Sequence, residues 1–269
     1  MPKIKVAVAG CLGRMGQEII NQILSNKKLL FVGGFEHKSH PMINKRIGDV
    51  SNINSHLIVT SDASKIIKSS DVLIDFTTPV STLTNVKKAA ANKTAIVIGT
   101  TGINTNQKNK IKTYSKKIPI LMSSNMSVSV NLLFKLVQET ALILKDSEYD
   151  IEIAETHHKH KVDAPSGTAL SLGEYAAKGR KTTLKKTQVM DRTKKNTQRK
   201  KGDIGFSVTR GGEIAGEHTV SFIGENDRVD LVHRANNRSM FVSGAIQAVI
   251  FISKKKNGFF DMKDLLFKN

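Results

Sequence analysis

Two periodicities of apolar residues alternate along the first 125 residues of the chain. Short runs rich in β-branched residues predict strands, and the segments between them repeat their apolar positions at helical spacing. In residues 14–24, for example, Met15, Ile19, Ile20 and Ile23 share one helical face. Strands that alternate with helices favour a parallel, doubly wound sheet. The expected strands are residues 4–9, 31–35, 56–60, 72–76, 95–99 and 118–122, and further helices are expected over 80–90 and 107–114.

The pattern changes after residue 125. A helix is expected over 130–144, then a strand over 149–155, a polar stretch, and a helix from about 166 to 177. Residues 205–235 alternate in short runs with turn signals at 211–212 and 225–227, which is typical of antiparallel strands. The apolar segment 242–253 and the turn 261–267 have no sheet of their own, so we expect them to pack on the first domain. The predicted fold is therefore α/β, with a doubly wound domain (residues 1–126 plus 240–269) and a second α+β domain on a mixed or antiparallel sheet (127–239).

Composition places the chain among ordinary globular proteins, with 39% hydrophobic and 24% charged residues in a length of 269. Cys11 is the only cysteine, which excludes an intramolecular disulfide and argues against a thiolate metal site. No apolar run approaches the roughly 18 residues of a membrane span. The N-terminal stretch reads as a first strand and lacks the features of a signal peptide, so a cytoplasmic protein that does not interact with membranes is expected.

The formal net charge of +19 raises nucleic acid as a possible partner. Residues 178–201 hold eleven Lys or Arg residues and one acid, Asp191, and so supply +10 of this charge. The segment has no aromatic residue to stack on bases, which favours a solvated loop over a polyanion-binding role.

A glycine-rich turn follows the first expected strand. In VAVAGCLGRMGQEI, Gly10, Gly13 and Gly16 stand where a Rossmann-like dinucleotide-binding domain brings its backbone close to a pyrophosphate at a helix N-terminus. The spacing is G-x-x-G-x-x-G, and glycines that serve only the turn remain an alternative. Glu36 follows the second expected strand, 20 residues after Gly16, where an acid binds a ribose hydroxyl.

Other polar segments end neighbouring strands at the edge of the sheet where doubly wound folds bind ligands. They are IGTTG at residues 98–102 and SSNMS at 123–127, and each alone is also compatible with an ordinary polar turn. His37 and Lys38, next to Glu36, carry groups that can accommodate a 2′-phosphate, so both NADH and NADPH are candidate cofactors.

The stretch THHKHKVDAPSGT, residues 156–168, has two interpretations that the residues themselves leave open. It is either a solvated basic loop or an anion pocket with a proton donor, in which Ser166 or Thr168 caps a helix whose free amides bind a carboxylate. The three histidines are too crowded to converge on one metal ion, so no metal site is predicted. With a dinucleotide fold, the second interpretation indicates reduction of a small acidic substrate.

Six motifs in this order resemble the 4-hydroxy-tetrahydrodipicolinate (dihydrodipicolinate) reductase family. They are AGCLGRMG, FTTP, IGTTG, SSNMSVSVN, ETHHKHKVDAPSGTAL and GEHTVSF, and they extend over nearly the whole chain. The resemblance implies reduction of a cyclic imine dicarboxylate by hydride from NADH or NADPH in lysine and diaminopimelate biosynthesis. It also implies a homotetramer assembled through the second domain, which would bind the substrate.

The resemblance also assigns site residues. It implies that His157 is the proton donor, that Lys161 is a second catalytic group, and that His158, Lys161, Gly167 and Thr168 contact the substrate carboxylates. The cofactor contacts implied by the motifs, with His37 beside them, are Gly10, Cys11, Leu12, Gly13, Arg14, Met15, Glu36, His37, Gly99, Thr100, Thr101, Ser123, Ser124, Asn125 and Met126.

The sequence departs from the family pattern at Cys11 and Ser129, where alanine and glycine are usual, and at His37, where arginine or lysine often follows the acid. The imidazole of His37 would hold a phosphate less firmly than a guanidinium, so the preference between NADH and NADPH stays open. The alternative function from another class is a nucleic-acid-binding or regulatory protein that retains the fold, and only the basic segment favours it.

Overall fold

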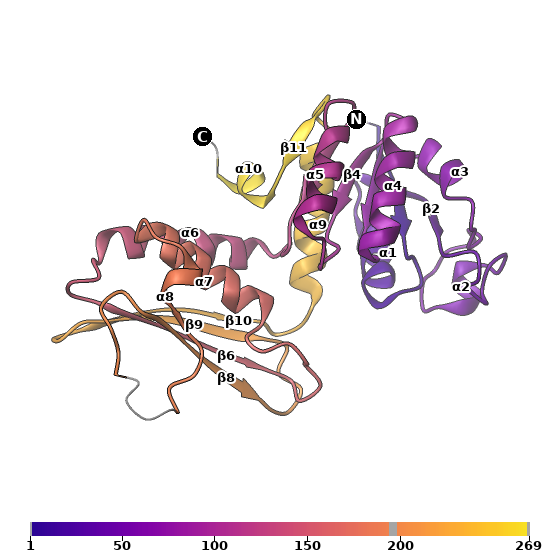
Figure 1. The fold of residues 1–269 in the computed structure, drawn as a ribbon. Coiled ribbons are helices and arrows are strands. Elements are labelled where there is room, and N and C mark those ends of the chain that lie inside the picture. Colours follow the sequence, from indigo (N-terminus) through magenta and orange to yellow (C-terminus); the bar gives the residue numbers. More distant parts are fainter. Residues whose placement is uncertain (1, 194–197, 268–269) are drawn as a thin grey trace. The chain divides into compact units, whose positions relative to one another are not determined.

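The computed structural model describes residues 2–193 and 198–267, which form two compact units (Figure 1). Unit 1 contains the described residues up to Val128 together with those from Ser239 onward, and unit 2 is Ser129–Arg238. The boundaries predicted from the sequence, 126/127 and 239/240, differ from these by at most two residues. The candidate cofactor residues all belong to unit 1, and the histidine stretch belongs to unit 2.

Unit 1 is built on a six-stranded sheet in which every pair of neighbouring strands is parallel. Its order is β11-β5-β4-β3-β1-β2. The strands are β1 (Ile4–Ala9), β2 (Leu29–Phe35), β3 (Val72–Asp75), β4 (Ala95–Ile98), β5 (Pro119–Met122) and β11 (Gly258–Phe260). The parallel sheet predicted from the alternating pattern is thus confirmed.

One predicted strand is wrong. Residues 56–60 form only isolated bridges, Phe35 with Thr60 and Arg46 with Ile58, and Val59 exchanges backbone hydrogen bonds with residues 44 and 45. This β-branched run pairs with a neighbouring loop, while the last strand to join the sheet is β11, from the far end of the chain. A three-residue strand is too short to show a hydrophobic period, so the pattern did not reveal it.

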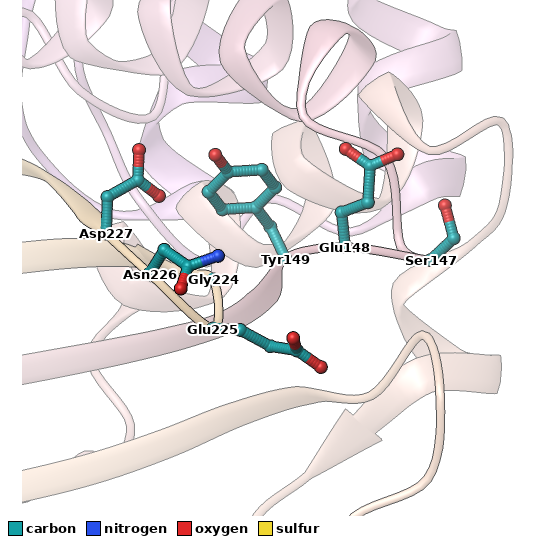
Figure 2. A pocket seen from close by; sticks show the side chains of 7 residues that line it. All are labelled: Ser147, Glu148, Tyr149, Gly224, Glu225, Asn226 and Asp227. Atoms are coloured by element: carbon teal, nitrogen blue, oxygen red, sulfur yellow. The ribbon is translucent and has the colours of Figure 1, made fainter.

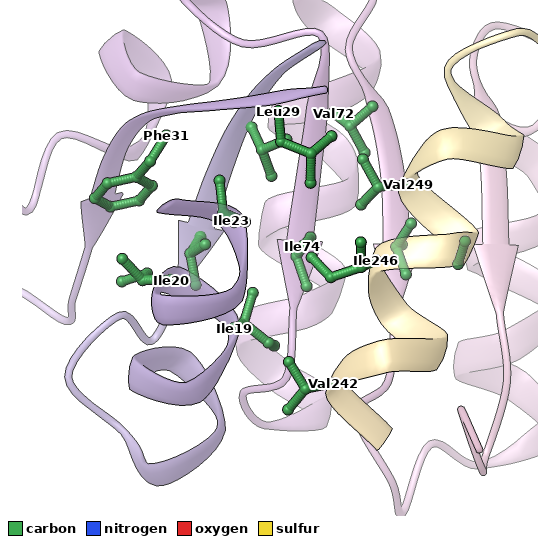
Figure 3. Close-up of a cluster of buried hydrophobic side chains, with 14 of the residues drawn as sticks. Ile19, Ile20, Ile23, Leu29, Phe31, Val72, Ile74, Val242, Ile246 and Val249 are labelled. Atoms are coloured by element: carbon green, nitrogen blue, oxygen red, sulfur yellow. The ribbon is translucent and has the colours of Figure 1, made fainter. Parts of the chain in front are cut away.

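Helices cover both faces of this sheet, as the doubly wound prediction requires. Ile19, Ile20 and Ile23 of α1 lie in one apolar cluster with Ile246 and Val249 of α9 (Figure 3). A second cluster joins the sheet to α3, α4 and α5. The helices of unit 1 are α1 (Arg14–Ser25), α2 (Ile47–Val50), α3 (Ala63–Lys68), α4 (Pro79–Ala91), α5 (Thr105–Tyr114), α9 (Ser239–Ile252) and α10 (Met262–Leu266). The C-terminal segment therefore packs on the first domain, as predicted.

Unit 2 contains a five-stranded mixed sheet in the order β10-β9-β6-β8-β7. Its central strand, β6, runs parallel to β8 and antiparallel to β9, so the mixed form of the prediction is confirmed. The strands are β6 (Asp150–His157), β7 (Gln188–Val189), β8 (Ile204–Arg210), β9 (Glu217–Ile223) and β10 (Arg228–Arg234), and the helices are α6 (Val128–Ile143), α7 (Gly167–Gly179) and α8 (Leu184–Thr187).

The alternation along β6 explains how unit 2 positions its polar groups. Ile151 and Ile153 point into the apolar cluster formed with α6 and α7. Since side chains alternate across a strand, the next two residues on the same face are Glu155 and His157, and both are buried. A carboxylate and an imidazole are thus carried to the end of a face that otherwise holds core residues.

The basic segment 178–201 includes arginines with defined structural partners. Arg180 donates to the carbonyl of Tyr149 at 3.1 Å, Arg192 pairs with Glu152 at 2.7 Å, and Arg199 contacts both Glu152 and Asp150. For these three residues the solvated-loop interpretation is wrong, because Arg192 and Arg199 pair with acids of β6 and Arg180 binds a backbone carbonyl beside that strand. Lys194 and Lys195 lie outside the described residues.

Within the described ranges, no helix is long and apolar enough to cross a membrane.

Candidate active site

The turn between β1 and α1 requires glycine at two points. Gly10 adopts a φ of 66°, and its N–H donates to the carbonyl of Phe35 at 2.9 Å. A Cβ on Gly16 would lie 2.1 Å from the carbonyl oxygen of Gly10, so the first turn of α1 packs directly on the loop. This is the close backbone approach that a pyrophosphate-binding turn needs.

Glu36 lies beside this turn, directly after β2. Its Oε1 accepts a hydrogen bond of 2.8 Å from the N–H of Leu12. The acid and the glycine turn are therefore in contact, which is where a dinucleotide fold holds the adenine ribose. His37 is exposed next to it, and its Nδ1 lies 2.8 Å from Oγ of Ser39.

Cys11 differs from its neighbours in this turn. Its side chain is buried against Gly34, where an added Cβ would lie 2.4 Å from that of Cys11. Burial, with the nearby charge of Glu36, raises the pKa of the thiol to about 12. Cys11 can therefore offer a cofactor only its backbone, whereas Arg14 is exposed.

A cavity of about 290 Å³ brings together the ends of β3, β4 and β5. A Cβ on Gly99 would lie 2.2 Å from the ring of Phe76, so that ring forms part of the wall only because residue 99 is glycine. Of the predicted cofactor residues, this cavity includes Met15, Gly99, Thr100, Thr101, Ser124, Asn125 and Met126, and it adds Phe76, Thr77 and Phe241, which the prediction omitted.

The remaining predicted cofactor residues do not line this cavity. Ser123 donates from Oγ to the carbonyl of Asn125 at 2.8 Å and so shapes the loop behind it. Gly10 to Arg14, Glu36 and His37 form the separate group around the glycine turn.

A buried carboxylate, Asp75, supports the cavity. It is fully buried and accepts hydrogen bonds from the N–H and hydroxyl of Thr77, the hydroxyl of Thr100 and the amide of Asn85, at 2.6 to 3.2 Å. Sequence reasoning missed it because a single acid at the end of a strand carries no motif.

In unit 2, the histidine stretch begins with a buried histidine bound to a buried carboxylate. Nδ1 of His157 lies 2.5 Å from Oε2 of Glu155. Arg210, on the neighbouring strand β8, binds both carboxylate oxygens at 2.8 and 2.9 Å, and the N–H of Ser166 donates to Oε1 at 2.9 Å. Four donors therefore converge on one carboxylate.

These contacts shift the pKa values of both Glu155 and His157. Burial would raise the pKa of Glu155, but hydrogen bonds from Arg210, His157 and Ser166 overcome it and hold that pKa below its usual range. Burial also lowers the pKa of His157, an effect that Glu155 opposes and that Lys161 and Arg210 reinforce. Glu155 is thus a fixed negative charge beneath a histidine that is otherwise disfavoured as a cation.

A second buried histidine packs against the first. The rings of His157 and His218 are 5.1 Å apart at an angle of 77°, and Nε2 of His218 lies 3.1 Å from Oγ of Ser166. Burial, with the nearby His157, lowers the pKa of His218 to about 4, so it is neutral at pH 7. On the other side, Gly216 leaves room for His157, because a Cβ there would lie 2.8 Å from Nε2.

The predicted anion-binding groups lie on the loop that follows. Ser166 caps α7 by accepting from the N–H of Ala169, which selects it over Thr168, a residue of the first helical turn. Lys161 is paired with Asp163 at 2.8 Å, and the N–H of Gly167 also interacts with the Asp163 carboxylate. In this structure, a carboxylate of the chain itself therefore contacts two of the groups predicted to bind a substrate carboxylate.

The other histidines of the stretch behave differently from His157. Nδ1 of His158 is buried and has no hydrogen-bond partner in the described part of the chain. His160 is exposed near Glu213, which agrees with a solvated side chain. Ser129, where the family usually has glycine, lies 3.0 Å from Nε2 of His233.

Three residues of this centre were missed by sequence reasoning: Glu155, Arg210 and His218. Glu155 and His218 stand inside the motifs ETHHKHKVDAPSGTAL and GEHTVSF, and the period-2 pattern of β6 could have revealed that Glu155 shares a face with His157. Arg210 carried no such signal, because only the register of β8 against β6 brings it there.

A second cavity, of about 350 Å³, lies beside the start of β6, at the end of that strand opposite His157 (Figure 2). Glu148, Glu225 and Asp227 line it, and a hydrogen bond from Tyr149 to Asp227 raises the pKa of that phenol. Its acidic lining does not suit an anion. Among the described residues, no group of three or more His, Cys, Asp or Glu side chains is placed to hold a metal ion.

Comparison with known families matches both units of the chain. Residues 4–126 match the model for the N-terminus of dihydrodipicolinate reductase, and residues 129–266 match that for its C-terminus. A 4-hydroxy-tetrahydrodipicolinate reductase of Polynucleobacter necessarius is 40% identical over 263 residues, with 98% of each chain covered. One from a Wolbachia of Drosophila simulans is 42% identical over 267 residues, covering 98% of this chain and 100% of that protein.

Solved structures agree with these matches. A dipicolinate-bound dihydrodipicolinate reductase from Paenisporosarcina sp. TG-14 has a TM-score of 0.77 at 25% identity, and the match covers 96% of this chain and 97% of that one. A diaminopimelate dehydrogenase of C. glutamicum, with a TM-score of 0.55 at 14% identity and coverage of 99% and 94%, shares the fold.

Proposed function

The chain belongs to the dihydrodipicolinate reductase family, and we propose that its two candidate regions divide that family's reaction between them. The reaction converts 4-hydroxy-tetrahydrodipicolinate to tetrahydrodipicolinate by loss of the 4-hydroxyl as water and gain of a proton and of a hydride from NADH or NADPH, in lysine and diaminopimelate biosynthesis. The chain is therefore an oxidoreductase. What remains to be assigned is which residues perform each step.

Unit 1 holds the cofactor in this proposal, and the residues present fit a dinucleotide. The glycine turn has no room for side chains at Gly16, and Glu36 lies in contact with the turn at the position of a ribose-binding acid. The end-of-strand cavity, lined by Thr100, Thr101 and Asn125 among others, takes another part of the cofactor. When bound, NADH or NADPH supplies the hydride.

Unit 2 holds the dicarboxylate and supplies the proton. Lys161, the N–H of Gly167 and the side chains of His158 and Thr168 bind the substrate carboxylates. His157 protonates the electron density that hydride addition leaves on the ring. The observation that carries this assignment is the geometry of His157, a buried imidazole held at Nδ1 by Glu155 with Nε2 next to the glycine at position 216.

The lowered pKa of His157 fits a donor whose charged form is favoured by bound substrate. In the free protein, burial disfavours the imidazolium. A bound dicarboxylate adds negative charge beside it and raises its pKa, so the histidine takes up a proton as the substrate binds. The protonated form of His157 is then more populated in the complex that uses it.

A kinetic comparison of four variants tests the assignment. His157→Gln should lower turnover by roughly 100-fold or more, the usual contribution of general acid catalysis, with a smaller effect on KM. His158→Gln should mainly raise KM. Lys161→Ala should damage both, because a charge-assisted contact is lost in the ground state and again as charge develops. His160→Gln, the exposed histidine of the same stretch, is the matched control and should resemble the wild type.

Substrate-dependent loss of NADH or NADPH absorbance measures turnover, and fluorescence titration measures cofactor affinity, which should survive all four changes. If His157→Gln keeps near-wild-type turnover at saturating substrate, that histidine is not the acid.

The proposal includes a homotetramer in the cytoplasm. The sheet face opposite α6 and α7 carries the row Ala154, Thr219 and Val232, in which Val232 is 45% exposed. This face fits a second copy of unit 2 better than a charged partner. Light scattering after gel filtration should give the tetramer mass for the wild type and a smaller mass for Val232→Lys, whereas Val80→Lys, an exposed change in unit 1, should leave the mass unaltered.

A further inference from the structure

We propose that Glu155, clamped by Arg210, is the positioning residue that fixes the tautomer and orientation of His157. The inference rests on the proposed role of His157 as proton donor and adds a residue to that reaction. Glu155 does not touch the substrate in this account. It acts through the imidazole that it holds.

The tautomer follows from counting donors on the carboxylate. Both oxygens of Glu155 accept from Arg210, and Oε1 accepts also from the N–H of Ser166. Such a carboxylate is ionised and can only accept, so Nδ1 of His157, 2.5 Å from Oε2, must carry a hydrogen. The proton that leaves or returns during the reaction is therefore the one on Nε2.

Surrounding residues keep Nε2 accessible. Gly216 lies against it, and any larger residue there would place its Cβ 2.8 Å from this nitrogen. The φ of Gly216, 152°, is also one that residues with a side chain rarely adopt. The imidazole is thus bound on its Nδ1 edge and left free of side-chain bulk on its Nε2 edge.

Charged or titratable groups from β6, β8, β9 and the loop after β6 surround His157. Glu155 on β6 favours the imidazolium, while Arg210 on β8 and Lys161 on the following loop oppose it, and His218 on β9 adds a neutral ring. Glu155 is the group that makes the charged form attainable in this environment. Its removal should therefore change the titration of His157 as well as its orientation.

Arg210 connects this pair to the anion loop. Besides binding Glu155, it donates to the backbone carbonyl of Asp163 at 2.6 Å. Asp163 is the residue whose side chain contacts Lys161. The guanidinium of Arg210 thus fixes Glu155, the carboxylate that binds His157. It also fixes the turn that carries the carboxylate-binding groups.

The first experiment compares Glu155→Gln with Glu152→Gln in the full-length protein. Glu152 is three residues earlier on the same strand and binds Arg192 and Arg199 instead, so it is the matched control. Glu155→Gln should lower kcat by roughly 100-fold with KM little changed, since an amide does not enforce the correct tautomer. The high-pH limb of kcat/KM should move to lower pH by about one to three units, because an opposite charge near the imidazole is lost. Glu152→Gln should change neither quantity.

Histidine-¹⁵N NMR gives a readout that a merely structural role would not move. In the wild type, neutral His157 should show a protonated Nδ1 and an unprotonated Nε2, with the signal assigned by its loss in His157→Gln. Glu155→Asp keeps a carboxylate on a shorter side chain. Its pH profile should therefore be closer to that of the wild type than its kcat is. This variant and the wild-type spectrum keep the test decisive if Glu155→Gln does not fold.

The outcomes separate the two proposals. If His157→Gln is slow but Glu155→Gln is not, or if the wild-type spectrum shows hydrogen on Nε2 alone, Glu155 does not position His157 and the inference is wrong. If His157→Gln itself retains turnover, the proposed function of His157 fails first.

Discussion

The described part of the chain buries two side-chain carboxylates, one in each unit, and stabilises them in opposite ways. Among the described residues, Asp75 accepts hydrogen bonds from neutral groups alone, Thr77 and Thr100 at the sheet edge and Asn85 of α4. Glu155 is held by a guanidinium and by an imidazole that can gain or lose a proton. Both are essentially inaccessible to solvent.

The difference matches the work proposed for each unit. Neutral donors fix a charge without coupling it to any other titration, which suits a wall that holds a cofactor. Charged and titratable partners couple the carboxylate to a histidine, so a change at one alters the proton affinity of the other. The comparison predicts that the unit 1 carboxylate affects stability alone, while that of unit 2 affects the pH dependence of turnover.

The largest effect is expected for Asp75→Ala. The change leaves the donors of Thr77, Thr100 and Asn85 without their buried acceptor, which should cost about 3 to 5 kcal/mol of unfolding free energy. Denaturant unfolding followed by circular dichroism measures it. The pH profile of the remaining activity should keep its wild-type position, and a shifted profile would show that Asp75 is coupled to the proton chemistry after all.

His218 should make the protein sensitive to acid. Its pKa is about 4 in the folded state and 6.5 in the unfolded state, so between these values the unfolded chain binds a proton that the folded chain does not. Stability should therefore fall as pH drops from 6.5 toward 4, by about 3 kcal/mol from this residue alone.

Melting temperatures measured from pH 7 to pH 4 test this. His218→Gln should show a shallower fall, while His56→Gln, an exposed histidine, should follow the wild type. Some acid sensitivity should persist in His218→Gln, since the depressed pKa of Glu155 gives stability that is lost as pH falls below its ordinary 4.5. Equal slopes in the wild type and His218→Gln would contradict the assigned burial effect.

Proton uptake should accompany binding of the dicarboxylate. Dipicolinate, the ligand of the Paenisporosarcina enzyme, is a suitable probe. If its charge raises the pKa of His157 by one unit or more, equivalent to about 1.4 kcal/mol, uptake of a fraction of a proton per site should be measurable near neutrality. Calorimetry in buffers of different ionisation enthalpy reports the number. His157→Gln should abolish most of it, and unchanged uptake in that variant would assign the proton elsewhere.

Local patterns predicted much of this molecule. The β-branched runs and amphipathic helices were sufficient for the parallel sheet, because each element is fixed by its own period and caps. His157 and Lys161 could be assigned a role because their motif is continuous in sequence. The strand period alone places Glu155 and His157 on one face, although the predicted site residues did not include Glu155.

Long-range register could not be predicted in the same way. Arg210 and His218 reach His157 only because β8 and β9 flank β6 in one alignment, which no local pattern specifies. The same limit explains the mistaken strand at 56–60, whose apolar run pairs with a loop, and β11, which joins the sheet from the end of the chain.

The smallest effect is expected at the exposed edge of the proposed cofactor site. His37 lies next to Glu36, the acid beside the glycine turn, and its Nδ1 contacts the hydroxyl and the N–H of Ser39. Without a guanidinium there, we predict that the protein uses both cofactors, with NADH at least comparable to NADPH. His37→Arg should favour NADPH by about tenfold in kcat/KM, or 1.4 kcal/mol, because arginine binds a 2′-phosphate with two hydrogen bonds and a fixed charge.

His56→Arg adds the same charge at another exposed histidine of unit 1 and controls for general attraction of an anionic cofactor. Turnover at saturating cofactor should be equal in all three proteins, since the change lies in the cofactor's unit and leaves the Glu155–His157 pair intact. A wild-type preference for NADPH above about 100-fold, or roughly 2.7 kcal/mol, would show that another group already binds the phosphate. In that case unit 1, too, would rely on a charged partner, and the contrast between the two units would be confined to their buried carboxylates.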